Sequence, residues 1–258
     1  MRKYLATIKY GLQYISAYKS ETFAMIVFKL IKMAFLVLLY GYVLRGLIPD
    51  YSTHEILSYL LIVNAIQVIT GIEFFRGARR IGRDIYSGVI TNILIKPVNV
   101  PVFEYLQDRG ERGVEYLLAL VEFAGGVALS LPALSVLPLF VLSVLIAIVL
   151  SYGLNLIVGS ITFWTTEQGG IKNGFSHAMK IFGGTLIPLN LLPPVTQTLV
   201  LLTPFPYAAY LPTRILQGGF ESVPVYCYFI AVAWAILALI LGNYLWKKGL
   251  KRYEAIGI

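Results

Sequence analysis

Apolar residues occur in long stretches along the whole chain, and polar residues gather in the segments between them. A helix needs roughly 20 mainly apolar residues to cross the hydrocarbon core of a membrane. Six stretches approach this length, at residues 24–43, 56–72, 114–131, 136–163, 175–192 and 223–246. The pattern predicts an all-α polytopic membrane protein with six transmembrane helices, in which residues 1–258 form a single transmembrane domain.

Residues 1–20 have a different pattern. Leu5, Ile8, Leu12 and Ile15 recur at spacings of three or four, with lysines on other faces and tyrosines between them. This period is typical of an amphipathic helix that lies in the membrane interface. We expect an interfacial helix on the inner leaflet, and the alternative is a basic, partly ordered N-terminus.

Composition and charge give the orientation. Hydrophobic residues make up 58% of the chain and charged residues 13%, against about 25% charged in a soluble domain. Lysine and arginine gather before the first stretch, between the second and third, and after the sixth, whereas the opposite side holds only Arg45 and Arg214. Basic loops face the cytoplasm. We therefore expect both termini in the cytoplasm, a place in the cytoplasmic (inner) membrane, and membrane lipid rather than nucleic acid as the partner of the basic residues.

Several charged side chains fall within or beside the apolar stretches. Lys29 and Lys32 lie in the first stretch, where we expect both to snorkel toward the cytoplasmic surface. Glu73 is placed to pair with Arg76 or Arg80 along one helix face. A candidate substrate path combines a buried acid of the third stretch with polar or aromatic residues of the fourth, and its members are Glu122, Asn155, Ser160, Thr162 and Trp164. The alternative is that these polar groups hydrogen-bond neighbouring helices and only hold the bundle together.

Prolines break the apolar segment at residues 193–219 into pieces that are too short to cross a membrane. Short re-entrant helices at the outer face, between spans five and six, explain both the length and the apolarity. The functional interpretation is an outer gate, and the alternative is a hydrophobic plug. The candidate gate residues are Pro188, Pro193, Pro204, Phe205, Pro206 and Pro212.

No catalytic constellation is found in the sequence. Neither Gly77–Gly82 nor Gly169–Gly174 continues into the Lys-Ser/Thr pair of a phosphate-binding loop, and the nucleophile elbow and the zinc-protease motif are missing. His54 and His177 lack metal-ligand spacing, and Cys227 is the only cysteine. We expect no catalytic residue, metal or cofactor on this chain, so any work must draw on a partner or an ion gradient.

Three segments together resemble the permease subunits of the ABC type-2 exporter family. Residues 81–99 are similar to the family's cytoplasmic segment, residues 183–193 to its motif at the end of the fifth span, and residues 203–218 to its outer segment. In the first segment the matching residues are Ile85, Gly88, Leu94, Lys96, Pro97, Val98 and Asn99. One departure is Val89–Ile90, where the family pattern has an acidic residue followed by leucine.

The resemblance implies a cytoplasmic coupling helix, within residues 75–100, that docks in a groove of a separate ATPase subunit. A docked helix needs an apolar stripe and orienting charges, which we assign to Ile85, Val89, Ile93 and Leu94 and to Arg79, Arg80, Arg83 and Asp84. Gly88 would allow close backbone approach, and Lys96 and Pro97 end the segment. The alternative is a loop that only enforces topology.

The resemblance further implies an ATP-driven exporter of a hydrophobic or amphipathic substrate. ATP and Mg would be bound by cytoplasmic ABC ATPase subunits, and a second permease subunit, identical or related, would complete a dimer. Two other classes stay open at this point. An ion-driven secondary transporter would transport without ATP, and a membrane scaffold would not transport at all.

Overall fold

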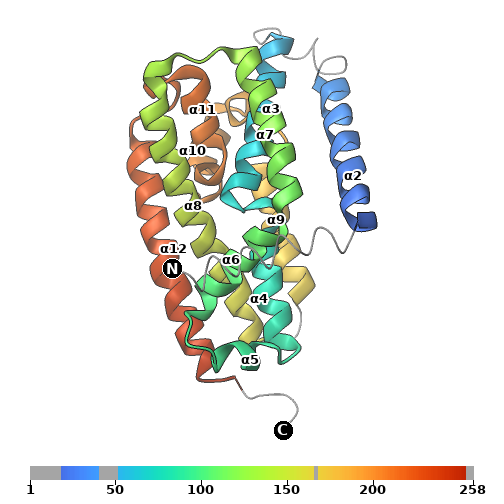
Figure 1. Ribbon diagram of the computed structural model, residues 1–258. Helices are drawn as coiled ribbons and strands as arrows, with labels where there is room; N and C mark the ends of the chain where they lie inside the picture. Colours follow the sequence, from blue (N-terminus) through green and yellow to red (C-terminus); the bar gives the residue numbers. More distant parts are fainter. Residues whose placement is uncertain (1–18, 41–51, 166–167, 254–258) are drawn as a thin grey trace.

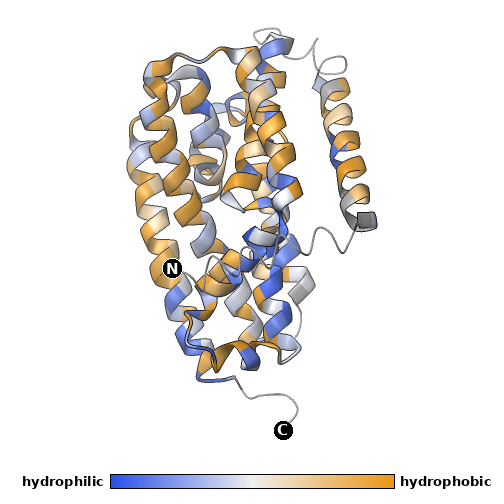
Figure 2. Cartoon of the chain, in the orientation of Figure 1, coloured by the Kyte–Doolittle hydropathy of each residue, from blue (hydrophilic) through white to orange (hydrophobic). Residues whose placement is uncertain are grey.

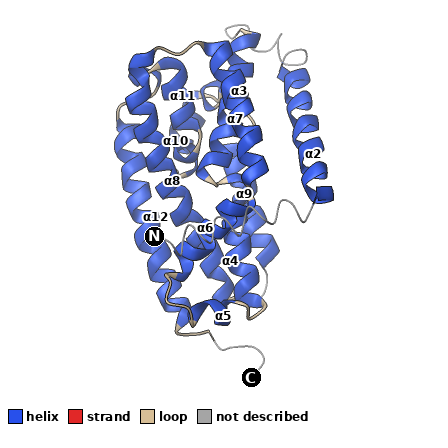
Figure 3. Ribbon diagram, in the orientation of Figure 1, coloured by secondary structure: helices blue, strands red, loops and turns tan. Residues whose placement is uncertain are grey.

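The computed structural model describes residues 19–40, 52–165 and 168–253. These residues form helices joined by turns and contain no strand (Figure 3). The α-helices are α2 (Lys19–Leu38), α3 (Thr53–Thr70), α4 (Arg76–Tyr86), α5 (Ile90–Leu94), α6 (Val100–Glu111), α7 (Gly113–Ser130), α8 (Leu137–Ser160), α9 (Gln168–Phe182), α10 (Pro194–Leu201), α11 (Tyr210–Gly218) and α12 (Tyr226–Leu250). The 3-10 turns are η2 (Glu73–Phe75), η3 (Leu134–Val136), η4 (Ile161–Phe163), η5 (Leu189–Leu191), η6 (Phe205–Ala208) and η7 (Phe220–Ser222).

Four described segments are long and apolar enough to cross a membrane. They are His54–Tyr86, Gly113–Ser130, Leu134–Phe163 and Tyr226–Leu250. They overlap the second, third, fourth and sixth stretches of the sequence, and the first of them continues beyond residue 72 through α4 to Tyr86. The chain therefore has the helices of a multi-pass membrane protein. The predicted interfacial helix at residues 1–20 lies almost wholly outside the described residues.

The other two predicted spans differ in form. Helix α2 begins before the predicted start of the first span, and residues 41–51, which include the predicted end, lie outside the described part. The predicted helix over 175–192 is wrong, because α9 ends at Phe182. Gly184 then adopts φ of 70°, a left-handed conformation that glycine tolerates, and the chain turns toward Pro188. The count of six spans stays a prediction.

Close helix packing depends on small residues. Helix α8 packs along α12 and α3 packs along α7 (Figure 1). At the α8–α12 contact a Cβ added to Gly153 would lie 2.8 Å from the Cβ of Ala238. At the α3–α7 contact the Ser58 hydroxyl donates a 2.8 Å hydrogen bond to the carbonyl of Gly126. Small residues that let backbones approach are the usual means by which membrane helices associate.

The bundle has two chemically different ends. In Figure 2 the α4–α5–α6 region, at the lower end, is rich in hydrophilic residues, whereas α7, α8 and α12 are mainly hydrophobic above it. The start of α3, the α7–α8 turn and α11 lie toward the opposite, upper end (Figure 1). We use "lower end" and "upper end" in this sense throughout.

Helix α2 reaches the bundle through long polar side chains. Lys29 Nζ lies 3.3 Å from Glu122 Oε2 on α7, and Lys32 Nζ donates a 2.5 Å hydrogen bond to Asn64 Oδ1 on α3. Both lysines thus bind polar groups of other helices, whereas the sequence predicted that they snorkel. A polar partner within the bundle removes the cost of leaving an ammonium group alone among apolar side chains.

Candidate functional site

Helices α3 and α4 are separated by a rigid break. Gly71 ends α3 in a left-handed conformation, and Phe74 and Phe75 follow with φ of 53° and 49°. Non-glycine residues adopt such angles only where the surroundings hold them. The break redirects the chain from the membrane helix α3 into the lower end.

Asn155 on α8 holds this break from the side. Its Nδ2 donates to the carbonyls of Gly71, at 3.2 Å, and Ser151, at 2.8 Å, and its Oδ1 accepts from the amide of Ala78 at 3.0 Å. Both polar atoms of the Asn155 side chain therefore form hydrogen bonds with main-chain groups. Asn155 was a candidate for a substrate path, but its geometry is that of a clamp between α3, α4 and α8.

Arg109 on α6 caps the end of α3. Its Nη1 donates to the carbonyl of Ile69 at 2.9 Å, and its Nη2 donates to the carbonyl of Thr70 at 2.5 Å. The last carbonyls of a helix have no partner within the helix and carry partial negative charge, which a cation neutralises. Sequence reasoning counted Arg109 among the basic loop residues and missed this role.

Two buried ion-pair groups join the helices of the lower end. Arg112 Nη2 lies 3.0 Å from Glu73 Oε2, and its Nε lies 2.7 Å from Glu115 Oε2. The other oxygen of Glu115, Oε1, pairs with Arg76. The predicted pairing of Glu73 with Arg76 or Arg80 is wrong, because the break between α3 and α4 turns Glu73 toward Arg112.

The second group centres on Arg80. Its Nε lies 2.7 Å from Glu104 Oε2 and its Nη1 lies 2.7 Å from Glu111 Oε1, both on α6. Asp84 lies 4.0 Å away on the next turn and also pairs with Arg83 at 3.0 Å. Arg80 thus ties α4 to α6, Asp84 pairs within α4, and neither of these largely buried side chains is available to a partner.

Burial raises the pKa of the Glu104 carboxyl to about 7, with Arg80 opposing the shift and Asp84 adding to it. The folded chain therefore binds this proton more tightly than the unfolded chain does, and folding stability should fall as pH rises from about 5 to about 8. We expect Glu104→Gln to flatten this pH dependence of the unfolding temperature, measured in detergent. Equal slopes in the parent and the variant would contradict the assignment.

The turn between α4 and α5 forms the tip of the lower end. Gly88 has φ of 76° at this turn, Pro97 lies in the bend after α5, and Asn99 caps the start of α6. The predicted apolar stripe is divided here. Ile85 and Ile93 are only 4% and 6% exposed, because they pack in a core with residues of α8 and α12.

The other apolar residues of the turn are exposed. Val89 and Leu94 are 46% and 37% exposed, and two neighbours that the sequence analysis did not select, Tyr86 and Ile95, are 57% and 81% exposed. We call these four residues the tip patch. The cations Arg79, Arg83 and Lys96 are exposed on α4 and after α5. The apolar stretch ITNILI, residues 90–95, continues past Leu94 to Ile95. This was the local signal for a larger exposed apolar surface, and it was missed.

The structure does not gather the candidate path residues at one place. Glu122 pairs with Lys29, Ser160 is buried, and Trp164 is half-exposed beside Phe163. Thr162 lines a cavity of about 330 Å³ at the lower end, together with Arg79 and Lys172. The selected residues are therefore mainly contacts between helices.

The candidate gate residues occupy the region of α10, η6 and α11. Pro206 and Pro212 are buried, and Pro204 and Phe205 are half-buried, with the Phe205 ring tilted against Phe175 and Phe182. Pro193 is exposed at the start of α10. Pro188 differs from the rest, because it lines a cavity.

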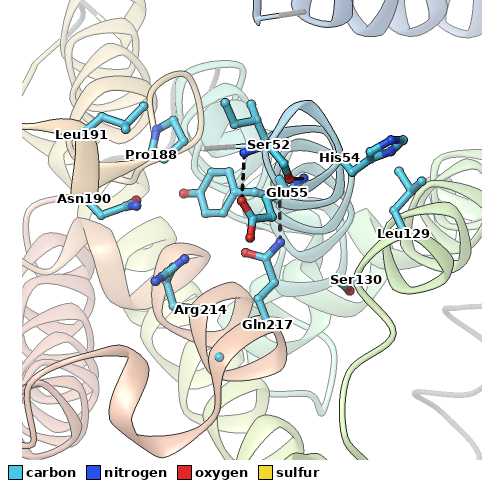
Figure 4. A pocket seen from close by; sticks show the side chains of 13 residues that line it. Ser52, His54, Glu55, Leu129, Ser130, Pro188, Asn190, Leu191, Arg214 and Gln217 are labelled. Atoms are coloured by element: carbon cyan, nitrogen blue, oxygen red, sulfur yellow. Dashed lines mark hydrogen bonds between the residues drawn. The ribbon is translucent and has the colours of Figure 1, made fainter. Parts of the chain in front are cut away.

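That cavity, of about 500 Å³, opens at the upper end between α3, α7, η5 and α11. We call it the upper cavity. Figure 4 shows the side chains of Glu55, Asn190, Arg214 and Gln217 around the same space. In the sequence, Arg214 is recognisable only as a basic residue on the outer side. The other lining residues carry no local signal, because they come from segments that are far apart in the chain.

Comparison with known proteins places the whole described bundle in one family. The family model described as "ABC-2 family transporter protein" matches residues 24–257. No curated protein matches the chain. The family match covers the tip patch, the ion-pair groups and the upper cavity alike. The chain therefore belongs to the ABC-2 transporter family, whose members are the membrane components of transporters.

Proposed function

We propose that the chain is the transmembrane permease subunit of an ATP-driven exporter that moves a hydrophobic or amphipathic substrate. In this proposal the lower end faces the cytoplasm, where ABC ATPase subunits bind ATP and Mg, and a second permease subunit completes a dimer. Family membership implies an ATPase partner. The positive-inside rule supports the orientation, because most described cations lie at the lower end or beside it.

The tip patch carries the proposal. It exposes two large apolar residues of the predicted stripe, Val89 and Leu94, and two others of the same coupling segment, Tyr86 and Ile95, in a part of the chain that is otherwise hydrophilic. Exposed apolar residues with a charged rim are typical of a surface that docks into a groove of a partner. The patch also projects from helices that Arg80 and Arg112 join to the membrane bundle, so a force on the patch reaches the spans.

The structure changes which residues should contact the ATPase. Val89, Leu94 and Ile95 are exposed, whereas Ile85 and Ile93 support the turn from inside. ATP-driven closure of the ATPases would move the tip, and the spans would follow as linked rigid bodies. The permease performs no covalent chemistry in this cycle.

Co-purification tests the proposal. We expect an ATPase to co-purify with the tagged chain from native membranes in mild detergent, and we expect a Val89→Asp/Ile95→Asp variant to lose it. A charge buried in a docked apolar surface loses solvation without gaining a partner. Asn92→Asp is the matched control, because it adds the same charge to α5 without removing an apolar contact.

The outcomes separate the classes. An ATPase retained by the double variant would move the contact elsewhere on the chain. Absence of any ATPase beside the folded parent would sink the ATP-driven proposal. In that case transport driven by an ion gradient would favour a secondary transporter, and no transport would favour a scaffold.

A further inference from the structure

The upper cavity contains a cation that has no counter-charge among the described residues. Arg214, on α11, lines the cavity, and its Nε is buried without a hydrogen-bond partner. Within the ranges that the structure describes, no carboxylate lies within salt-bridge distance of this guanidinium. The deeply placed arginines of the lower end are different, because Arg80 and Arg112 each bind at least two carboxylates.

A partly buried guanidinium is stabilised by an anion that accepts its fixed set of N–H donors. Carboxylate and phosphate oxygens match this geometry and form charge-assisted hydrogen bonds. A volume of about 500 Å³ is within the range of small-molecule sites. The cavity thus has both the charge and the space for an anionic group.

An acceptor faces the cavity from the opposite wall. Glu55 lines the cavity from the first turn of α3, and its Oε2 accepts a 3.0 Å hydrogen bond from the amide of Ser52. The carboxylate does not pair with Arg214. The Gln217 amide lies between the two walls, and its Nε2 donates to the carbonyl of Glu55 at 3.4 Å (Figure 4). The same Nε2 lies 3.1 Å from Ser58 Oγ, to which it also donates. A ligand that meets both walls needs an anion at one end and a hydroxyl or ammonium donor at the other.

The rim of the cavity is apolar on one side. Leu129 and Leu191 line it, and Leu131 and Leu134, which follow in the α7–α8 turn, are both 82% exposed. An acyl chain can cover this surface while the polar group enters the cavity. The combination of a polar interior and an apolar rim is that of an amphiphile site and differs from a site for a small inorganic ion.

We infer that the upper cavity binds the headgroup of an amphiphile, with a phosphate or carboxylate on Arg214 and a hydroxyl or ammonium donor on Glu55. The inference deepens the proposed function, because it gives the class of molecule that an outward-facing site of the permease would hold. The amphiphile is either a phospholipid of the outer leaflet or the exported substrate, and the two share this headgroup chemistry.

Binding to the purified full chain in a neutral detergent tests the inference. The probes are dihexanoyl phosphatidylethanolamine, dihexanoyl phosphatidylglycerol, the uncharged dihexanoyl glycerol and inorganic phosphate, each titrated by microscale thermophoresis. We expect both phospholipids to bind, the uncharged lipid to bind at least tenfold more weakly, and Arg214→Gln to weaken the phospholipids by about tenfold or more.

Three variants control the result. Arg214→Lys keeps the charge and should retain part of the affinity. Glu55→Gln keeps the N-terminal cap of α3, because glutamine also serves at this position of a capping box. It should weaken phosphatidylethanolamine, whose ammonium loses its counter-charge, more than phosphatidylglycerol. Lys172→Gln removes a cation from the cavity of about 330 Å³ at the lower end and should leave the affinity for both phospholipids unchanged. Unchanged unfolding temperatures exclude loss of fold as the cause.

The arms also separate the sources. Tight binding of inorganic phosphate alone, with no gain from the acyl chains, would overturn the amphiphile and leave a free-anion site. Equal affinity of the parent and Arg214→Gln for the phospholipids would overturn the inference as a whole. The binding experiment contains no ATPase. A failure of phospholipid binding would therefore overturn only the inference about the upper cavity, whereas a failure of co-purification would overturn only the ATP-driven proposal. Phosphatidylethanolamine or phosphatidylglycerol that co-purifies with the parent from native membranes, and is lost in Arg214→Gln, would assign the site to membrane lipid.

Discussion

Replacing Arg112 by methionine is expected to destabilise the chain by about 3–5 kcal/mol, the cost of leaving buried charges without their partner. The Arg112 side chain is fully buried, and it binds Glu73 and Glu115, whose side chains are 14% and 6% exposed. Without the guanidinium Glu73 loses its partner, and the buried Glu115 carboxylate keeps only the more exposed Arg76. The loss should appear as a lower unfolding temperature of the purified chain and as a lower free energy of unfolding.

Arg76→Met is the matched control. Arg76 also pairs with Glu115, but its side chain is 44% exposed, so water solvates the charge and Arg112 still neutralises the carboxylate. We expect a loss of at most about 1 kcal/mol. Adding Glu115→Gln to Arg112→Met should recover part of the stability. An equal loss from both arginine substitutions would show that burial of the network does not determine its energy.

Gly126→Ala is expected to separate α3 from α7 and to destabilise the bundle by about 1–3 kcal/mol, as overpacked cores are. A Cβ added to Gly126 would lie 2.6 Å from Ile62 Cγ1, 3.0 Å from the carbonyl oxygen of Ser58 and 3.2 Å from the amide nitrogen of Ile62. Two of these atoms belong to the backbone of α3, so a change of side-chain rotamer cannot relieve the contact. Lower unfolding temperatures and a weaker Ser58–Gly126 hydrogen bond should follow.

Gly125 is the neighbouring residue of the same helix and provides the control. A Cβ at Gly125 would meet only Leu61 Cδ1, at 3.7 Å, which is an ordinary van der Waals contact. Alanine is the better helix former by up to about 1 kcal/mol, so Gly125→Ala should be neutral or stabilising. If both alanine variants behaved alike, the close approach of α3 and α7 would not be the cause of the effect at Gly126.

The long apolar helices could be predicted from the sequence because twenty apolar residues in series have few alternatives to a membrane helix. The second, third, fourth and sixth stretches appear as helices close to their expected positions. The end of α9 was not predicted, although Gly183, Gly184 and Pro188 are local signals for a helix end, because the apolar residues around them fitted a continuous span. The turn there depends on Tyr59 of α3, whose hydroxyl donates to the carbonyl of Gly184 at 2.5 Å.

Roles of single polar residues were harder to predict. The coupling segment was located from its motif, but the sequence does not reveal that α8 and α12 cover Ile85 and Ile93 and leave Ile95 exposed. Asn155 is a polar residue in an apolar helix, as expected of a substrate path. Its hydrogen bonds, however, hold α3 and α4 against α8. The upper cavity depends on residues more than 150 positions apart, such as Glu55 and Gln217, whose proximity follows only from the packing of α11 on α3.

The clamp at Asn155 has a mechanical consequence. A break between two helices usually acts as a hinge, which absorbs motion. Here the amide of Asn155 and the guanidinium of Arg109 fasten both sides of the break, so α3 and α4 form one bent lever arm. One end of this lever carries the tip patch, and the other carries Glu55 at the wall of the upper cavity. In the proposed cycle, a displacement of the tip would therefore reach the wall of the upper cavity at the other end of the bundle.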